Sequence, residues 1–406
     1  MQNNLAPAEA NPSAAGASSD PKTFSHSFAS LNLLRGLSAW VVLFNHTATF
    51  VSSGKNLLSF NWGGLGVGVF MLISGFLMMW HFYERRDLGE TWGSSKTCLK
   101  FYVRRFFRIA PLYYLLLVIV YVFHGGLQQL ESQNHSVLLP AYVPGPHDPT
   151  STEMSVSQVL THFSFTFGFI PRYAASSILP DWSIGLEMQF YLFFPFLALL
   201  LVRSQYLWGT AFMLVVCWFS LKLFGVGTNA DPGPLGVFPY PTLLPLSFYP
   251  FLTGMLLAAA LYEKNNFAKR TFLLLLALFV AGICTKKFLL ICFLFAFYEL
   301  ALTCGTGIPP LDKTVKSVSR VVEHRVFKFM ADASYGVYLI HIPLLVLVIW
   351  LLIHLTSFAE LSPIMRFLTC FALVIPFVYA LAFLAFKYVE SPGIAFGRKI
   401  VKRMRQ

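Results

Sequence analysis

The chain has 406 residues, of which 56 % are hydrophobic and only 12 % are charged, and its mean hydropathy is +0.63. Soluble domains contain about 25 % charged residues, so this composition excludes a soluble globular protein and predicts an integral membrane protein. The formal net charge of +12 does not indicate nucleic-acid binding, because lysine and arginine orient the spans of a membrane protein. The six cysteines show no C-x-x-C spacing, which predicts neither a disulfide framework nor a metal site.

The order of apolar and polar segments predicts an all-α polytopic membrane protein without a large soluble domain. Residues 1–27 are rich in Ala, Asn, Ser and Pro, so we expect a disordered polar tail in the cytoplasm. Residues 28–390 form the predicted membrane domain, and residues 391–406 form a basic cytoplasmic tail. About ten apolar runs are expected to cross the bilayer. The expected spans are 31–51, 62–82, 108–123, 183–202, 208–224, 246–262, 271–284, 288–304, 334–355 and 365–386.

Basic residues are unevenly distributed between the connections, and this predicts the orientation. The connection between the second and third spans, counted to Arg108, holds seven basic residues and is expected to be cytoplasmic. The segment 125–179 has Arg172 as its only basic residue, and the segment 225–245 has no lysine or arginine. Both are therefore expected outside, which places the two chain termini in the cytoplasm.

The first span contains Arg35 and His46, which are eleven residues apart. At 3.6 residues per turn, this spacing places both side chains on one face, separated by roughly 16 Å along the axis. A charge at membrane depth costs roughly 2.5 to 3.5 kcal/mol even on the lenient insertion scale, and such residues usually face a bundle interior or a water-filled cavity. The pair therefore predicts a polar site. The alternative for each residue alone is structural: Arg35 reaches to the interface, and His46 bonds to a neighbouring helix.

Six motifs are spread along nearly the whole chain after residue 27. Three of them occur in register within the first three spans, and three more follow. They are LRGLSAWVVLFNH (34–46), GVGVFMLISGF (66–76), FYVRRFFRIAPLYY (101–114), WSIGLEMQFYLFFP (182–195), SYGVYLIHIPL (334–344) and YVESP (388–392). In sequence and order these motifs resemble the membrane-bound acyltransferase family 3.

This resemblance implies a ten-helix bundle in a bacterial inner membrane that transfers an acyl group, usually acetyl. The implied donor substrate is cytoplasmic acetyl-CoA or another acyl-CoA, with no tightly bound cofactor. The implied acceptor is a hydroxyl of an extracytoplasmic glycan or of a lipid-linked oligosaccharide, because several members of the family modify O-antigen, exopolysaccharide or peptidoglycan. A nucleic-acid partner is not expected, and the sequence does not fix the oligomeric state.

The chemistry of acyl transfer suggests roles for the polar residues. Transfer from a thioester to an alcohol needs a base for the hydroxyl or a nucleophile that holds the acyl group, and His46 can serve as either. Coenzyme A contains phosphates, for which the donor fork of arginine is well suited. The donor-binding candidates are Arg104, Arg105 and Arg108. The alternative for these three is an ordinary positive-inside cluster.

Arg35 and Glu187 complete the predicted catalytic set. Arg35 is expected to bind a phosphate or the pantetheine arm, or else to form a salt bridge with Glu187 or Glu390. Glu187 lies inside the fourth span, so it either pairs with a cation or takes part in proton transfer.

Five further residues are predicted helpers on the acceptor side. Ser334 and His341 are seven residues apart and share a helix face, with a hydrogen bond between helices as the structural alternative. Tyr338 and Trp182 can bind a sugar, or belong to the aromatic belts at the membrane interface. Glu390 is a further helper, or a surface partner of the basic tail.

The residues alone leave two other classes of protein open. A proton-coupled secondary transporter or a lipid-linked glycan permease would also use buried Arg, Glu and His, as proton relays and substrate clamps. A non-catalytic scaffold is a third class, although buried ionisable residues are costly to maintain. An enzyme is favoured by the basic cluster on the predicted cytoplasmic side, the histidine within the bundle, and the outer loops nearly free of basic residues.

Overall fold

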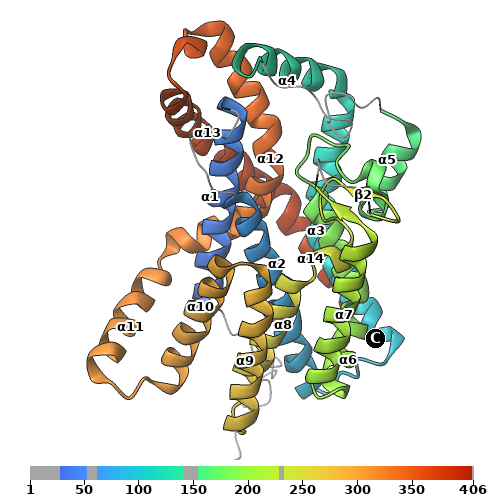
Figure 1. Ribbon diagram of the computed structural model, residues 1–406, viewed down its shortest axis with the longest axis vertical. Coiled ribbons are helices and arrows are strands. Elements are labelled where there is room, and N and C mark those ends of the chain that lie inside the picture. Colours follow the sequence, from blue (N-terminus) through green and yellow to red (C-terminus); the bar gives the residue numbers. More distant parts are fainter. Residues whose placement is uncertain (1–27, 53–61, 141–153, 228–232, 405–406) are drawn as a thin grey trace, which may run out of the picture.

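The computed structural model describes residues 28–52, 62–140, 154–227 and 233–404, and the predicted tail 1–27 lies outside this part of the chain. The described residues form a bundle of helices (Figure 1). Two strands of two residues each, β1 (Gly225–Val226) and β2 (Val237–Phe238), pair in parallel within one connection. The all-α fold class is therefore confirmed.

Seven helical segments among the described residues are long and apolar enough to cross a membrane. They are α2 (Trp62–Asp87), α3 (Ser95–Val122), α6 (Trp182–Arg203), α9 (Phe267–Cys284), α10 (Lys286–Cys304), α12 (Arg325–Leu355) and the continuous segment Pro363–Arg403. The other three predicted spans fall in α1 (Ala29–Val51) and in the shorter apolar helices α7 (Leu207–Leu223) and α8 (Tyr249–Tyr262). Each predicted span thus lies in a helix, whereas the number that crosses the bilayer and their orientation stay predictions.

Shorter helices fill the connections between these elements. The α-helices are α4 (His124–Leu138), α5 (Val156–Phe163) and α11 (Pro309–Val322), and the 3₁₀ turns are η1 (Phe167–Phe169), η2 (Pro171–Tyr173), η3 (Leu244–Leu246) and η4 (Phe358–Glu360). The segment 125–179, predicted as an external loop, therefore contains helical structure.

Two helices begin well before the spans that the sequence predicts. α3 starts at Ser95, whereas the sequence predicts a span that begins at 108. α12 starts at Arg325, whereas the sequence predicts a span that begins at 334. In both cases the added turns contain basic residues, which a hydropathy criterion excludes. Helical hydrogen bonding continues past the apolar length, because a helix does not need to end where the bilayer ends.

The centre of the bundle is a close contact between α2 and α8. A Cβ atom on Gly75 would lie 2.2 Å from the carbonyl oxygen of Phe251, and one on Gly254 would lie 2.1 Å from that of Leu72. Small residues let membrane helices approach each other closely, and these two glycines do so from opposite sides of one contact. The contact holds α2, which forms one wall of the site, against a buried helix.

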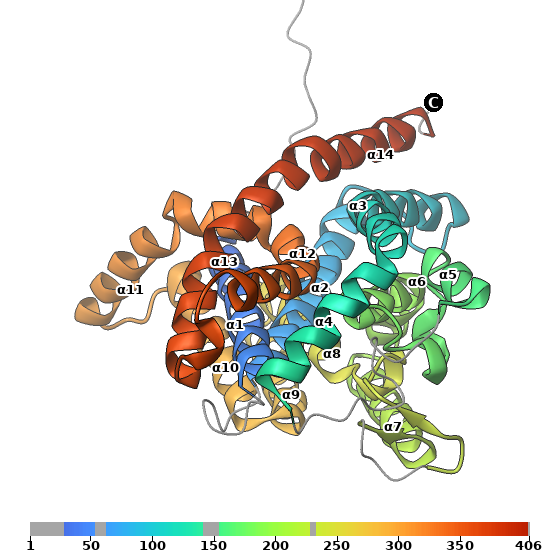
Figure 2. The ribbon, with the colours of Figure 1, turned by 90° about the horizontal axis from the view of Figure 1, so that it is seen from above.

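The predicted C-terminal tail is a helix in the structure. α13 (Pro363–Ala385) continues through a π-helical turn, η5 (Phe386–Glu390), into α14 (Ser391–Arg403). α14 extends away from the bundle beside α3 (Figure 2). Gly393 and Gly397 pack directly on Pro111 and Phe107 of α3. This packing places α14, which lies in the predicted basic tail, against a helix that lines the site.

Candidate functional site

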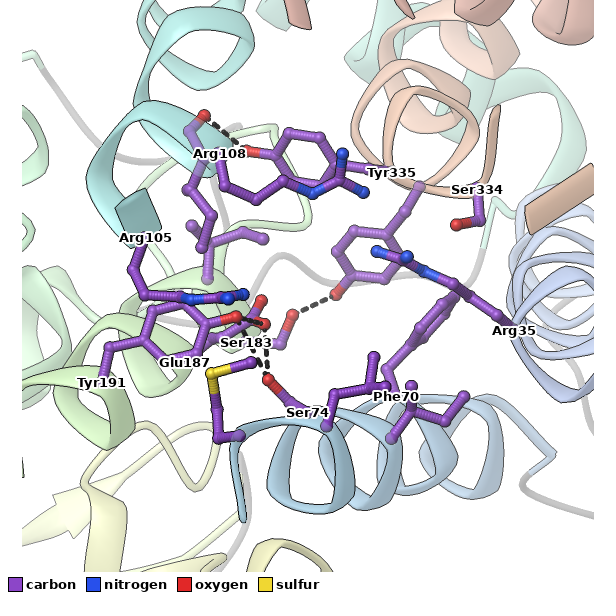
Figure 3. A pocket seen from close by; sticks show the side chains of 16 residues that line it. Arg35, Phe70, Ser74, Arg105, Arg108, Ser183, Glu187, Tyr191, Ser334 and Tyr335 are labelled. Carbon is purple, nitrogen blue, oxygen red and sulfur yellow. Dashed lines mark hydrogen bonds between the residues drawn. The ribbon is translucent and has the colours of Figure 1, made fainter. Parts of the chain in front are cut away.

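A cavity opens between α1, α2, α3, α6 and α12 (Figure 3). Its volume is roughly 770 Å³, including the part that is open to solvent. Six of the predicted site residues line it, namely Arg35, Arg105, Arg108, Glu187, Ser334 and Tyr338. These residues are far apart in the sequence, so the fold brings together the donor-side and helper candidates that spacing alone could not connect.

Three arginines converge on this cavity. Arg35 enters from α1, while Arg105 and Arg108 enter from α3 on the opposite side (Figure 3). The guanidinium of Arg105 lies 5.7 Å from the ring centre of Tyr191 and 5.8 Å from that of Phe101. Stacking on aromatic faces holds the plane of a guanidinium and leaves its N–H donors directed at a ligand. The three side chains form a surface suited to anionic oxygens.

Glu187 is held by hydroxyl groups. The Ser74 hydroxyl donates a hydrogen bond of 2.8 Å to the Glu187 carboxylate, and the Tyr191 hydroxyl donates another to the same oxygen (Figure 3). Among the described residues no ion pair within 4 Å joins Glu187 to Arg35 or to another cation. The cation pair weighed from the sequence is therefore replaced by two hydrogen bonds, which hold the carboxyl group at the cavity wall.

Glu390 is buried behind the arginines. It ends the π-helical turn, has no exposed surface, and places one carboxylate oxygen 3.9 Å from Nη1 of Arg108. Neither oxygen accepts a hydrogen bond within the described part of the chain. The surface pair with the basic tail that the sequence allowed is wrong, because the side chain faces the protein interior. Glu390 instead balances the charge of a cavity arginine from outside the cavity lining.

His46 and His341 are in direct contact. Nδ1 of His46 lies 2.8 Å from Nε2 of His341, and the two rings are stacked with centres 5.0 Å apart. His341 is fully buried, and its Nδ1 lies 2.6 Å from the carbonyl oxygen of Tyr338. The Tyr338 hydroxyl is 2.7 Å from that of Ser183, a residue of the cavity wall. Tyr338 therefore connects the histidine pair to the cavity.

A family model described as an acyltransferase domain matches residues 28–383. The protein belongs to the acyltransferase 3 family. As a member it is a multi-pass integral membrane protein. A protein of Acidianus two-tailed virus named "Putative acetyltransferase ORF330" is 28 % identical over 193 residues, which are 44 % of this chain and 46 % of that protein. The chain thus matches less than half the length of this relative. No solved structure matches the chain.

Some predicted site residues lie away from the cavity, and one lining residue bonds within its own helix. Arg104 is about 100° around the helix from Arg105 and is not among the lining residues. Trp182, at the start of α6, stacks on Tyr240 with ring centres 5.6 Å apart. The Ser334 hydroxyl donates to the carbonyl of Ala331 at 2.7 Å, so it makes a hydrogen bond within its own helix.

Sequence reasoning did not predict the contacts of several hydroxyl groups at this site. Tyr191 lies one helical turn after Glu187, and this spacing could have identified the pair. Ser74 and Ser183 had no comparable signal, because a serine in an apolar helix usually bonds to its own backbone. Their contacts depend on how α2, α6 and α12 meet.

Proposed function

We propose that this protein moves an acyl group, specifically acetyl, from cytoplasmic acetyl-CoA to a hydroxyl of an extracytoplasmic or lipid-linked glycan. The observation that carries the proposal is the convergence of Arg35, Arg105 and Arg108 on one cavity beside a hydrogen-bonded carboxylate. Phosphates of coenzyme A suit this surface, because guanidinium forks bind phosphate oxygens with charge-assisted hydrogen bonds. The acetyl group is further supported by the name of the viral relative.

His46 is the proposed base or acyl carrier. It lies about three helical turns from Arg35, roughly 16 Å along α1. Coenzyme A has its thioester at the end of the long pantetheine arm, so a donor held by its phosphates near Arg35 needs its reactive group at a distance. As base, His46 takes the proton of the acceptor hydroxyl while that oxygen attacks the thioester carbonyl and the C–S bond breaks. As carrier, a ring nitrogen first forms the bond to the acyl carbon, and the thiolate leaves.

The orientation that this function needs follows from the distribution of basic residues. The donor is cytoplasmic, and α2, α3, α11 and α14 contain most of the basic residues of the predicted cytoplasmic side. A reporter fused after Arg403 should therefore be cytoplasmic, and one inserted at His135 in α4 should be external. A cytoplasmic reporter at His135 would contradict the proposed orientation and, with it, an external acceptor.

The experiment that tests the function is release of coenzyme A by the purified, full-length protein. The protein is given acetyl-CoA with and without glycan from the producing cell, and free thiol and acetylated glycan are measured together. Transfer requires both to rise in equal amounts. A glycan permease would instead move the glycan across vesicles without releasing coenzyme A. The acceptor is identified by mass spectrometry of surface glycans from cells with and without the protein.

A further inference from the structure

The hydrogen bonds of His341 fix which of its ring nitrogens holds the proton. Nδ1 of His341 lies 2.6 Å from the carbonyl oxygen of Tyr338 and 3.2 Å from that of Val337. A carbonyl oxygen can only accept a hydrogen bond, so this nitrogen must be the donor and must be protonated. Both acceptors belong to the preceding turn of α12, which means that the helix itself sets the orientation of the ring.

His341 is also uncharged in this environment. Its side chain is fully buried, and no carboxylate lies within ion-pairing distance of either imidazole in the described part of the chain. A buried charge without a partner is strongly disfavoured. Because a neutral imidazole has one N–H and one lone pair, Nε2 of His341 presents a lone pair. That lone pair faces Nδ1 of His46 at 2.8 Å.

The contact therefore determines which ring nitrogen of His46 is protonated. Nδ1 of His46 must be the donor to His341, so the lone pair of neutral His46 lies on Nε2. No donor or acceptor among the described residues bonds to Nε2 of His46, and the side chain is only half-buried. Nε2 of His46 is therefore unbonded within the described part of the chain, and neither histidine is among the residues that line the cavity.

We infer that His341 is a positioning residue that holds His46 as its Nδ1–H tautomer and makes Nε2 of His46 the reacting atom. The inference rests on the proposed function, in which His46 is the base or acyl carrier. In the serine-protease triad a carboxylate accepts the hydrogen bond that fixes the tautomer of the histidine, whereas here a neutral imidazole accepts it. When Nε2 takes a proton or the acyl group, Nδ1–H still donates to His341, so the contact persists through the reaction without rearrangement.

Nε2 of His46 is the reacting atom in both versions of the proposed chemistry. A base at Nε2 accepts the proton of the acceptor hydroxyl there, and a carrier forms its bond to the acyl carbon there. Free histidine has no neighbour that selects one nitrogen, so loss of His341 would let His46 populate both tautomers. Turnover would then fall through a wrong proton position, with little change in donor binding.

The test reads the tautomer directly, without relying on activity. Full-length protein labelled with ¹⁵N-histidine in lipid nanodiscs is measured by NMR at about pH 8, above the ordinary histidine pKa of about 6.5. The signals lost in His46→Gln identify His46 among the ten histidines. We expect a protonated Nδ1 and an unprotonated Nε2. In His341→Leu, which removes the acceptor but keeps an apolar side chain of similar size, we expect a shift toward Nε2–H.

Acetyl transfer by the same variants provides the second readout. His341→Gln can place an amide oxygen where Nε2 was, so it should keep the tautomer and most of the turnover. His341→Leu should lower turnover by about tenfold or more, toward the roughly 10⁴-fold loss that a wrong tautomer causes in a serine protease, with the KM for acetyl-CoA nearly unchanged. Protonation of His46 at Nε2 in the wild type, or an unchanged tautomer in His341→Leu, would overturn the inference. A wild type that has the expected tautomer but releases no coenzyme A would instead contradict the proposed function.

Discussion

His162 and His46 are both held by hydrogen bonds inside the protein, but their rings are used differently. Nδ1 of His162 lies 2.9 Å from a carboxylate oxygen of Asp181, and its Nε2 lies 3.2 Å from the hydroxyl of Ser176. The Tyr113 hydroxyl donates to the same Asp181 oxygen at 3.0 Å. Every member of this cluster is buried. In His46, by contrast, only one ring nitrogen has a hydrogen-bonding partner among the described residues.

The His162 cluster has the residue types of a Ser-His-Asp triad without the conditions for its chemistry. Ser176 is only 3 % exposed, and its hydroxyl also donates to the carbonyl of Tyr173 at 3.1 Å. None of the triad-like residues lines the cavity of Figure 3. The cluster instead joins α5 and the following turns to α3 and to the start of α6. His46 and His341 do not line that cavity either, so the difference lies in the hydrogen bonding: a fully satisfied network holds an element in place, whereas His46 keeps one ring nitrogen unbonded among the described residues, which a substrate can use.

The largest effect should follow from changing the open histidine. His46→Gln keeps a hydrogen-bonding side chain but cannot cycle a proton or hold an acyl group, so turnover should fall by at least about 100-fold. The KM for acetyl-CoA should change little, since the donor phosphates are bound elsewhere. Coenzyme A release by purified protein measures both. His354→Gln, at an exposed histidine near the end of α12, is the matched control and should retain activity.

If His46→Gln transfers the acyl group at a near wild-type rate, His46 has a structural role, as His162 does. The catalytic role would then pass to His341 or Glu187. Insertion of the variant is checked by its yield in the membrane fraction.

A substitution in the His162 cluster should lower the stability of the protein without lowering its turnover. His162→Phe fills the volume but leaves Asp181 and Ser176 without their partner, which should lower the free energy of unfolding by about 1–3 kcal/mol. The thermal midpoint of detergent-solubilised protein should fall accordingly, while turnover per folded molecule stays within about twofold. His354→Phe again serves as the control, because that side chain is exposed. A loss of turnover with an unchanged midpoint would indicate that His162 takes part in the chemistry.

The polar face of α1 could be predicted from the sequence. Helical periodicity places Arg35 and His46 on one face, and the structure has Arg35 in the cavity wall. The sequence allows a hydrogen bond from His46 to a neighbouring helix and, separately, one from His341. It does not identify the two residues as partners, because spacing within one helix does not show which helices pack together. Counted from the observed start at Arg325, His341 lies about as far along α12 as His46 lies along α1.

The His162 cluster was missed for a different reason. His162 and Ser176 lie in the segment 125–179, expected to be an external loop, where neither hydropathy nor spacing indicates which side chains become buried. Glu390 illustrates the same limit at the other end of the chain. Its burial arises from the π-helical turn and from the packing of α14 on α3, which depend on tertiary contacts and not on local pattern.

A smaller effect is expected at the donor side of the cavity. Arg105→Ala removes one stacked guanidinium, so the KM for acetyl-CoA should rise by about tenfold, consistent with the loss of a hydrogen bond to a charged group. Turnover should stay within about threefold, because phosphate binding contributes equally to ground and transition states. A donor that lacks the 3′-phosphate provides a second measurement. It should have a higher KM than acetyl-CoA with the wild type, and the difference should be smaller with the arginine variant that has lost the contact to this phosphate. Equal responses of wild type and variant would mean that Arg105 orients the helix and does not bind the donor.

The smallest effect should come from Arg104, which provides a matched control on the same helix. Its neighbour Arg105 lines the cavity, whereas Arg104 points about 100° away around α3 and does not. Both substitutions remove one positive charge from the same turn, so any influence of charge on insertion or on long-range attraction of the donor is shared. Arg104→Ala should therefore leave the KM for acetyl-CoA within about twofold of wild type, compared with the roughly tenfold rise in Arg105→Ala. If the two variants raise KM equally, the basic cluster attracts the donor as a diffuse positive field, and the separation between lining and non-lining arginines has no consequence for binding.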